Sequence, residues 1–336
     1  MSPATIRDVA ERAKVGIGTV SRVLNQHPYV SAETRKKVLE AIEELNYTPN
    51  LIAKQLSSGR THAIAVTLPF LTYPSFVERL RGVQTALADS DYVLILYSAE
   101  SASQRDVNLT DLSQTTRTDG VLIVSVPLSE DNADRFLDTN TPVVLVDIFH
   151  PQFNRVFVDE VEGGKMATQH LIDLGHHKIA FISDVLNPDF QFLAMRERYR
   201  GYQTALRQNR IQIDPRYHLE APHGQYEAKL LAEQLMQMED PPTAIFAGSD
   251  TQAVGVLNAA RELHIRVPEE LSVIGYDGIR DAEYMNLTTI EQPLFDSGVE
   301  GVNLLISLIE KPSQDIHEIR MPLKLHLRGT TAQLIG

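Results

Sequence analysis

Apolar and polar positions alternate at helical spacing through the first 45 residues. One apolar set is Ile6, Val9, Ala10 and Ala13. After the break at Lys14-Val15-Gly16, a second set follows at Val20, Val23 and Leu24. Two short helices joined by such a turn form a helix-turn-helix unit. A third helix is predicted after the capping residue Ser31, with an inner face of Val38, Leu39, Ile42 and Leu45.

From residue 63 onward the pattern changes, because apolar runs recur about 25–35 residues apart and amphipathic helical segments separate most of them. The strand-like runs are Ala63–Thr67, Tyr92–Tyr97, Gly120–Val124, Val143–Val146, Ile179–Ile182, Ala244–Phe246 and Val273–Tyr276. This alternation predicts βα units with parallel sheets. About 270 residues are too many for one open sheet, so two Rossmann-like subdomains are expected.

These patterns define three predicted domains. Residues 1–48 form an all-α helix-turn-helix head, and residues 49–60 form a hinge helix and linker. Residues 61–336 form an α/β body. Its subdomains are expected at about 61–157 plus 294–325, and at 158–290 plus 326–336.

Charge is distributed unevenly along the chain. The net charge is −13, yet residues 1–60 carry nine Lys/Arg and six Asp/Glu, while the remainder carries 22 basic and 38 acidic residues. A basic head on an acidic body favours phosphate binding at one end only. No apolar stretch approaches a membrane span, the N-terminus lacks the pattern of a signal peptide, and there are no cysteines. A cytoplasmic protein without a membrane partner is expected.

The outer face of the second helix carries groups that can reach phosphates or base edges: Thr19, Ser21, Arg22 and Asn25. On the pattern alone, a three-helix bundle without a nucleic-acid role stays open. The segments TIRDVAERAKVGIGTVSRVLN and VSAETRKKVLEAIEELNYTPNLIAKQL, however, closely resemble the head of the lactose-repressor (LacI) family of bacterial regulators. The resemblance implies a recognition helix in the major groove of a palindromic operator.

The family pattern implies that Ile17, Gly18 and Arg22 are the base-reading positions. Ile17 and Gly18 offer no side-chain hydrogen bond, so they are expected to contribute a thymine-methyl contact and close backbone approach. Arg22 is the candidate for a bidentate guanine contact. Phosphate contacts are expected from Thr5, Ser21, Asn25 and Thr34.

In the family the hinge forms a helix that lies in the minor groove and pairs with its twin from a second subunit. Residues 50–56 are long enough for about two helical turns, which are unstable alone in water. The resemblance implies DNA contacts by Asn50 and Ala53, with Leu56 as a wedge that kinks the duplex. A flexible linker with an incidental leucine is the alternative.

The body resembles the same family, and through it the periplasmic sugar-binding proteins, in LGHHKIAFI, AIFAGSDTQAVGVLNAARELHIRVPEELSVIGYDG, LTTIEQP and LHLRGTT. A ligand is expected between the subdomains, near the carboxyl ends of the strands. The resemblance assigns Arg196 and Asp277 to a pair that grips it. Asp147 and Ser249 also follow strand-like runs, whereas Asp250 and Asp159 can equally be helix caps. Aromatic walls are expected from Phe70, Tyr73, Phe76 and Phe149, with Phe190 and Phe192 as further candidates.

Aromatic faces opposite polar anchors favour a sugar as effector, although a nucleobase stacks equally well. The predicted function is therefore a sequence-specific DNA-binding regulator, most simply a repressor, that acts as a homodimer under allosteric control by a small molecule. A solute-binding or nucleobase-sensing protein whose ligand acts as co-repressor is the alternative. No catalytic signature is present, so no enzyme activity and no cofactor are expected. The pair His176-His177 is interpreted as a solvated turn rather than a metal site.

Overall fold

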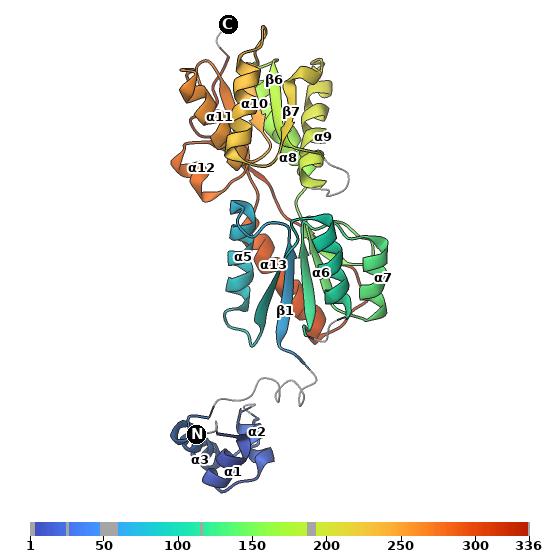
Figure 1. Ribbon diagram of the computed structural model, residues 1–336, viewed down its shortest axis with the longest axis vertical. Helices are drawn as coiled ribbons and strands as arrows, with labels where there is room; N and C mark the ends of the chain where they lie inside the picture. Colours follow the sequence, from blue (N-terminus) through green and yellow to red (C-terminus); the bar gives the residue numbers. More distant parts are fainter. Residues whose placement is uncertain (1–3, 25–26, 48–59, 115–116, 187–192, 335–336) are drawn as a thin grey trace. The chain divides into compact units, whose positions relative to one another are not determined.

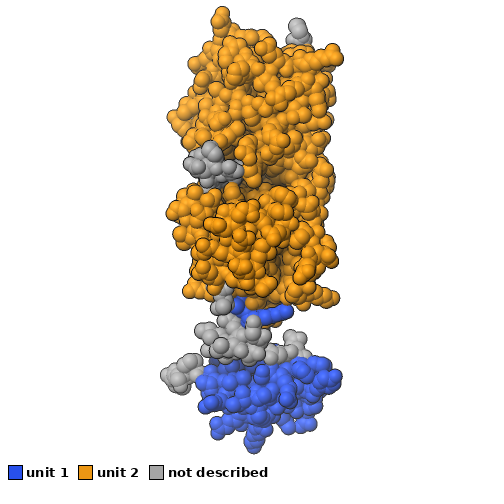
Figure 2. Space-filling view, turned by 90° about the vertical axis from the view of Figure 1, so that its right-hand side faces the viewer, with its two compact units in different colours: residues 1–61 blue, residues 62–336 orange. Residues whose placement is uncertain are grey.

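A computed structural model describes residues 4–24, 27–47, 60–114, 117–186 and 193–334 of the chain. It contains two compact units, which we call the head (residues 1–61) and the body (residues 62–336) (Figure 2). None of the described helices has the length and apolar composition of a bilayer-spanning segment.

The head is built from the helices α1 (Ile6–Ala13), α2 (Ile17–Leu24) and α3 (Ala32–Glu44). Reciprocal capping starts α1, because the Thr5 hydroxyl accepts from the Asp8 amide and the Asp8 carboxylate accepts from the Thr5 amide at 2.7 Å. Lys14 ends α1 in the left-handed conformation, with φ of 53°. The three helices enclose a small core of Val9, Ala10, Ala13, Val20, Val23, Val38 and Ala41.

The body holds two six-stranded sheets. The first has the order β11-β5-β4-β3-β1-β2 and the second β12-β10-β9-β8-β6-β7. Neighbouring strands run parallel except β10 and β12, which pair antiparallel. The first sheet and its helices, here the first lobe, comprise β1 (Ala63–Leu68), α5 (Pro74–Leu87), β2 (Val93–Ser98), α6 (Ala102–Gln114), β3 (Gly120–Val124), α7 (Glu130–Asp138), β4 (Val143–Val146), β5 (Asn154–Phe157), α13 (Leu294–Glu310) and β11 (Glu318–Arg320).

The second lobe comprises α8 (Glu160–Asp173), β6 (Ile179–Asp184), α9 (Leu193–Gln208), the 3-10 turn η1 (Pro215–Tyr217), β7 (His218–Ala221), α10 (Gln225–Met236), β8 (Ala244–Ala247), α11 (Asp250–Glu262), β9 (Ser272–Asp277), α12 (Arg280–Tyr284), β10 (Thr288–Glu291) and β12 (Lys324–His326).

Helices cover both faces of each sheet. In the first lobe, α5 and α13 lie together on one face and α6 and α7 on the other (Figure 1). Successive strand residues supply the two cores in turn: Ile64, Val66 and Leu68 pack toward α5 and α13, while Ala65 packs toward α6 and α7. Both faces of the central strands are therefore buried, which explains why these strands read as continuous apolar runs.

The chain crosses between the lobes at residues 158–159, 292–293 and 321–323. The third crossing corrects the sequence-based boundary. Residues 324 and 325 were assigned to the first subdomain, but they belong to β12, which pairs with β10 in the second sheet. The short strand β11 has already completed the first sheet, so the second lobe resumes at residue 324, two residues before the expected 326.

Glycines let helices cross in close contact. A Cβ on Gly298 of α13 would lie 2.2 Å from the Arg79 carbonyl oxygen of α5, and one on Gly82 of α5 would lie 2.0 Å from the Phe295 carbonyl oxygen. The crossing of α8 and α9 is built the same way, because a Cβ on Gly201 would lie 2.2 Å from the Val161 carbonyl oxygen. These close crossings hold α5, α8 and α9 in place, the helices that carry Arg79, Glu160 and Arg198.

Candidate effector cavity and DNA-binding face

A cavity lies within the body at the carboxyl ends of its strands. It holds about 510 Å³ of space free of protein atoms, including its mouth. Its lining comes from both lobes and from the second crossing: Tyr73, Ser75, Phe76, Arg79, Ser125, Asp147, Glu160, Asp184, Ala194, Met195, Arg198, His223, Ser249, Asp277 and Gln292.

Three lining residues at strand ends have a positive φ. Ser125 follows β3 with φ of 52°, Asp147 follows β4 with φ of 57°, and Asp277 ends β9 with φ of 115°. Residues other than glycine rarely adopt such angles, which cost free energy and cluster where a side chain must be aimed. The backbone therefore turns these side chains toward the cavity at the point where each strand ends.

The first-lobe wall of the cavity is organised by Arg79, which is buried on α5. Its Nη2 donates to the Asp147 carboxylate and, at 3.3 Å, to the Gln292 side-chain oxygen, while its Nε donates to Ser297 at 3.2 Å. Burial raises the pKa of Asp147, and the positive charge of Arg79 opposes that rise. The second Asp147 oxygen, Oδ1, has no hydrogen-bond partner among the described residues.

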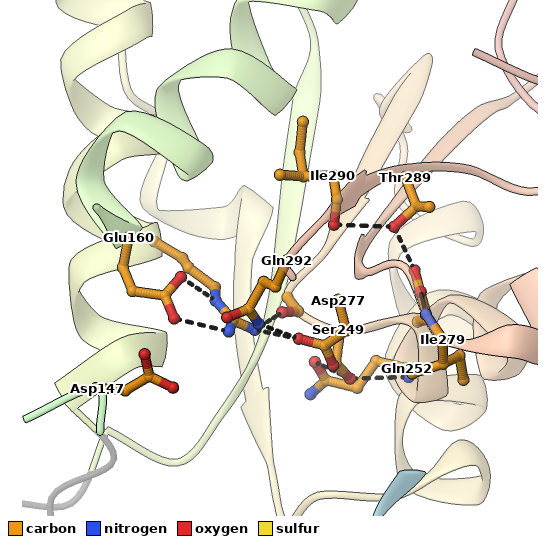
Figure 3. A network of polar contacts seen from close by, with 12 residues as sticks. Asp147, Glu160, Ser249, Gln252, Asp277, Ile279, Thr289, Ile290 and Gln292 are labelled. Carbon is orange, nitrogen blue, oxygen red and sulfur yellow. Dashed lines mark hydrogen bonds and ion pairs between the residues drawn. The ribbon is translucent and has the colours of Figure 1, made fainter. Parts of the chain in front are cut away.

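The second-lobe wall is organised by Arg198, which is buried on α9. Its acidic partners Glu160 and Asp277 are labelled in Figure 3. Its Nε and Nη2 form a bidentate pair with Glu160 at 2.9 and 3.0 Å. Its Nη1 donates to the Gly248 carbonyl at 2.7 Å and lies 3.3 Å from Asp277. Burial alone would lower the pKa of this guanidinium, but the charges of Glu160 and Asp277 raise it, so Arg198 stays protonated.

Gln292 links the two walls through the second crossing. Its amide nitrogen donates to Asp277 at 2.7 Å, while its oxygen accepts from Arg79. A continuous polar chain therefore runs from Asp147 through Arg79, Gln292 and Asp277 to Arg198. Apart from the unpaired Asp147 Oδ1, the members of this buried network are paired with one another, which holds them in one arrangement.

Behind this network, Asp250 fixes the turn that follows Asp277. Its carboxylate accepts from the Thr289 hydroxyl at 2.6 Å and from the Ile279 amide at 2.9 Å. Burial and the charge of Asp277 raise the pKa of Asp250 to about 8. Ser249, and not Asp250, caps α11, because its hydroxyl accepts from the Gln252 amide at 3.1 Å. Asp159 caps α8 and also pairs with Arg320 in the third-crossing region at 2.8 Å.

Aromatic rings meet across the cavity. Tyr73 of the first lobe stacks on His223 of the second lobe with centroids 4.5 Å apart, and Phe70 stacks behind Tyr73 at 4.3 Å. The Asp184 carboxylate pairs with His223 Nδ1 at 2.9 Å and accepts from the Gln252 side-chain amide at 3.0 Å. Burial alone would lower the pKa of His223, but the hydrogen bond and charge of Asp184 outweigh burial and raise it.

This raised pKa predicts a pH-dependent stability of the body. Protonated His223 stabilises the fold, so its contribution is fully present below the ordinary value of 6.5 and is lost as pH rises through the raised folded pKa. We expect His223→Gln to remove that part of the pH dependence of Tm, measured by thermal unfolding across neutral pH. His177→Gln, at an exposed position, is the control. An unchanged slope in His223→Gln would contradict the prediction.

The structure places the sequence-predicted effector residues in two groups. Tyr73, Phe76, Asp147, Ser249 and Asp277 line the cavity. Phe70 is one ring removed, behind Tyr73. Phe149 lies elsewhere: it is 59% exposed and stacks on Arg155 at 4.6 Å. Phe190 and Phe192 fall outside the described residues.

Arg196 does not line the cavity, and Arg198 takes the place expected of it. Met195, Arg198, Gly201 and Tyr202 form the buried stripe of α9, whereas Arg196 is exposed on the opposite face. Five further lining residues were not predicted from the sequence: Arg79, Glu160, Asp184, His223 and Gln292. Arg79 could have been found as a charged residue in the apolar stripe between Phe76 and Val83, and Asp184 as an acid at a strand end.

His176 is likewise not solvated as expected. It is buried, with Nδ1 and Nε2 each 3.0 Å from a hydroxyl, those of Thr243 and Ser272. His177 beside it is exposed. The described residues contain no group of three or more metal-ligating side chains.

In the head, the positions predicted to contact DNA bases lie on the outer side of α2. Ile17 is 45% exposed, Gly18 has open space where a Cβ would be, and Arg22 is exposed. Thr19 and Ser21 are half-buried between them and the core residues Val20 and Val23.

The predicted phosphate contacts of the head are only partly described. The Thr5 hydroxyl donates to Asp8 at 2.7 Å, and Thr34 accepts from the Ser31 hydroxyl at 2.8 Å. Asn25, Asn50, Ala53 and Leu56 lie outside the described residues.

Known proteins resemble both units. Residues 5–50 match the family described as bacterial regulatory proteins, lacI family, and residues 168–331 match the periplasmic binding protein-like domain. The HTH-type transcriptional repressor PurR of Vibrio vulnificus is 33% identical over 98% of this chain and 99% of its own length. The lac repressor dimer bound to operator and the anti-inducer ONPF has a TM-score of 0.86 at 29% identity, covering 98% of this chain and 100% of that one.

A complex of the transcriptional regulator CelR with cellobiose has a TM-score of 0.71 at 29% identity, covering 97% of this chain and 99% of that one. The predicted fold class, a helix-turn-helix head with an α/β body of two periplasmic-binding-protein-like subdomains, is confirmed by these matches. The chain belongs to the LacI family of bacterial regulatory proteins.

Proposed function

We propose that this LacI-family protein is a DNA-binding transcriptional repressor whose operator affinity is set by a small molecule held in the body cavity. The observation that carries the proposal is the pairing of two sites in one chain. The head exposes Arg22 and Ile17 on one side of α2, and the body holds a paired polar network around a cavity at its strand ends. The relatives named above are regulators, which supports a role without catalysis and an action in the cytoplasm, where the DNA is.

Recognition of the operator bases is assigned to Arg22, while Ile17 and Gly18 shape the surface of α2 that contacts the DNA. Arg22 offers two parallel donors, which match the acceptor pair of guanine in the major groove. Ile17 offers an apolar group suited to a thymine methyl. Residues 49–60 are proposed as the hinge, with Leu56 as its minor-groove wedge.

We expect Arg22→Ala to weaken binding to the preferred operator by about 1–3 kcal/mol and to relax specificity at one base pair. The operator is first selected from a random duplex library with the wild-type chain, and both proteins are then compared on all single-base variants of it by mobility shift. Arg12→Ala, whose side chain pairs with Glu44 in the wild type, is the control. Equal weakening on every sequence would identify Arg22 as a phosphate contact instead.

A sugar is the proposed effector class. The cavity combines hydroxyl and carboxylate groups with the rings of Tyr73 and Phe76, which suits a ring with polar edges and apolar faces. The CelR structure with cellobiose supports this assignment. The ligand shifts DNA affinity only by binding one arrangement of the lobes more tightly than another. The polar chain through Gln292 and the Tyr73–His223 stack are the contacts that such a shift would change.

A homodimer is the proposed assembly, as the lac repressor structure is a dimer. The edge strand β2 exposes Val93 and Leu96, at 55% and 43%, and α5 exposes Val77 at 40%. An edge strand with exposed apolar side chains invites pairing with a second surface. A twofold axis through such a dimer would match a palindromic operator.

A further inference from the structure

Carboxylates outnumber cationic groups around the effector cavity. Among the described lining residues the acids are Asp147, Glu160, Asp184 and Asp277, and the bases are Arg79, Arg198 and His223. Asp147, Glu160 and Asp277 are each less than one-tenth exposed. With all four acids ionised and His223 protonated, this group carries one negative charge in excess, and desolvation strengthens its effect on a ligand.

The bases are already engaged within the protein. Each nitrogen of the Arg198 guanidinium contacts an internal acceptor, from Glu160, Gly248 or Asp277. Arg79 is held by Asp147, Gln292 and Ser297. To reach Arg198, or the Nε and Nη2 donors of Arg79, a phosphate or carboxylate would have to displace these partners, leaving buried carboxylates without a counter-charge.

One feature of the cavity favours an anion. The first turn of α5, with Ser75 and Phe76, lines the cavity, and α5 has no side-chain cap. A helix N-terminus is equivalent to about half a positive charge. This half charge is smaller than the full negative charge of one carboxylate. Because Asp147 lies on the same side of the cavity, its charge outweighs that of the helix N-terminus. By contrast α11 and α8 are capped by Ser249 and Asp159.

The acceptors that remain point to a donor-bearing ligand. Asp147 Oδ1 is buried without a hydrogen-bond partner in the described part of the chain. Beside it the cavity offers the rings of Phe76 and Tyr73 and the hydroxyl of Ser125. We propose that the effector is a small hydroxylated molecule with no negative charge, and that phosphorylated or acidic derivatives of it are rejected. This inference rests on the proposed sensor function.

The test uses the full chain and probes that share a scaffold but differ in charge. Thermal unfolding is measured with glucose, glucosamine and glucose 6-phosphate, with ribose and ribose 5-phosphate, with cellobiose, and with adenosine and its monophosphate. Ligand binding to the folded state raises Tm by mass action. On any scaffold that shifts Tm, we expect the neutral or amino compound to bind at least about tenfold more tightly than the phosphate, the equivalent of about 1.4 kcal/mol.

Each outcome separates the inference from the function on which it rests. A phosphate that binds more tightly than its neutral parent overturns the inference and leaves the sensor function standing. The absence of any shift across the panel counts against the sensor function, and the inference falls with it. A neutral or amino hit with a weaker phosphate supports both.

A matched pair of variants tests the cause of the selectivity. Glu160→Gln keeps the size of the side chain, removes one buried charge and frees part of the Arg198 guanidinium. Glu162→Gln makes the same change at an exposed position of α8, two residues away. The ratio between parent and phosphate affinities should narrow in Glu160→Gln and stay as in wild type in Glu162→Gln. An unchanged affinity ratio in Glu160→Gln overturns the inference. If Glu160→Gln does not fold, the same ratio is measured in Asp184→Asn.

Discussion

Replacing Arg198 by methionine is expected to lower the free energy of unfolding by about 3–5 kcal/mol. Methionine fills similar space against the Tyr276 ring, on which the guanidinium lies at 3.8 Å, so packing is largely kept. The charge is lost, however, and the buried Glu160 and Asp277 remain without their counter-charge. Burial raises the pKa of Asp277 and the charge of Arg198 opposes that rise, so without Arg198 this acid takes up a proton more readily. The loss of stability should therefore grow as pH rises from acid to neutral.

Arg196→Met is the control for this change. Arg196 is the same residue type on the same helix, two positions earlier, and it is exposed. Denaturant unfolding of both variants at several pH values measures the difference, together with probe binding by the cavity. If the two variants lose equal and small amounts of stability, Arg198 is not the electrostatic centre of the second-lobe wall.

The second large effect is expected at the crossing of α5 and α13. A Cβ on Gly298 would lie 2.2 Å from the backbone oxygen of Arg79 and 3.0 Å from the backbone nitrogen of Val83. Backbone cannot rotate away, so Gly298→Ala must separate the helices. We expect a cost of about 3 kcal/mol, at the upper end for overpacked cores. Because α5 carries Arg79, the variant should also weaken binding in the cavity.

Gly301→Ala is the matched control on the same helix. Its Cβ would meet a methyl group of Leu122 at 3.0 Å, a side chain that can shift. Both variants gain the same helix propensity, about 1 kcal/mol for alanine over glycine. The difference between their unfolding free energies therefore reports the backbone contact. Equal stabilities would show that the two helices have room to move apart.

Much of the fold was predictable because its central strands are buried on both faces. Their apolar runs, such as Gly120–Val124 and Val143–Val146, stand out in the sequence. The short strands β7 (His218–Ala221) and β11 (Glu318–Arg320) were missed because they are polar and lie at sheet edges or next to them. A partly solvated strand of three or four residues leaves little periodicity to detect.

The site was predictable where chemistry follows directly from strand ends, as at Asp147 and Asp277. It was not predictable where a side chain reaches in from a helix, as Arg79 and Glu160 do. The error at Arg196 is one of helical phase. Gly201 lies on the buried face of α9, which a residue three positions earlier shares and a residue five positions earlier does not. Arg198 satisfies that condition and Arg196 does not.

The order of the chain also governs how the body is made during translation. The second lobe draws on residues 160–291, with β12 added at its edge. The first lobe begins earlier in the chain but needs α13 and β11, which are synthesised more than 130 residues after β5. Until then α5 has no partner for its glycine crossing, and the nascent first lobe exposes apolar surface. The later-encoded lobe should therefore fold on the ribosome before the earlier one is complete.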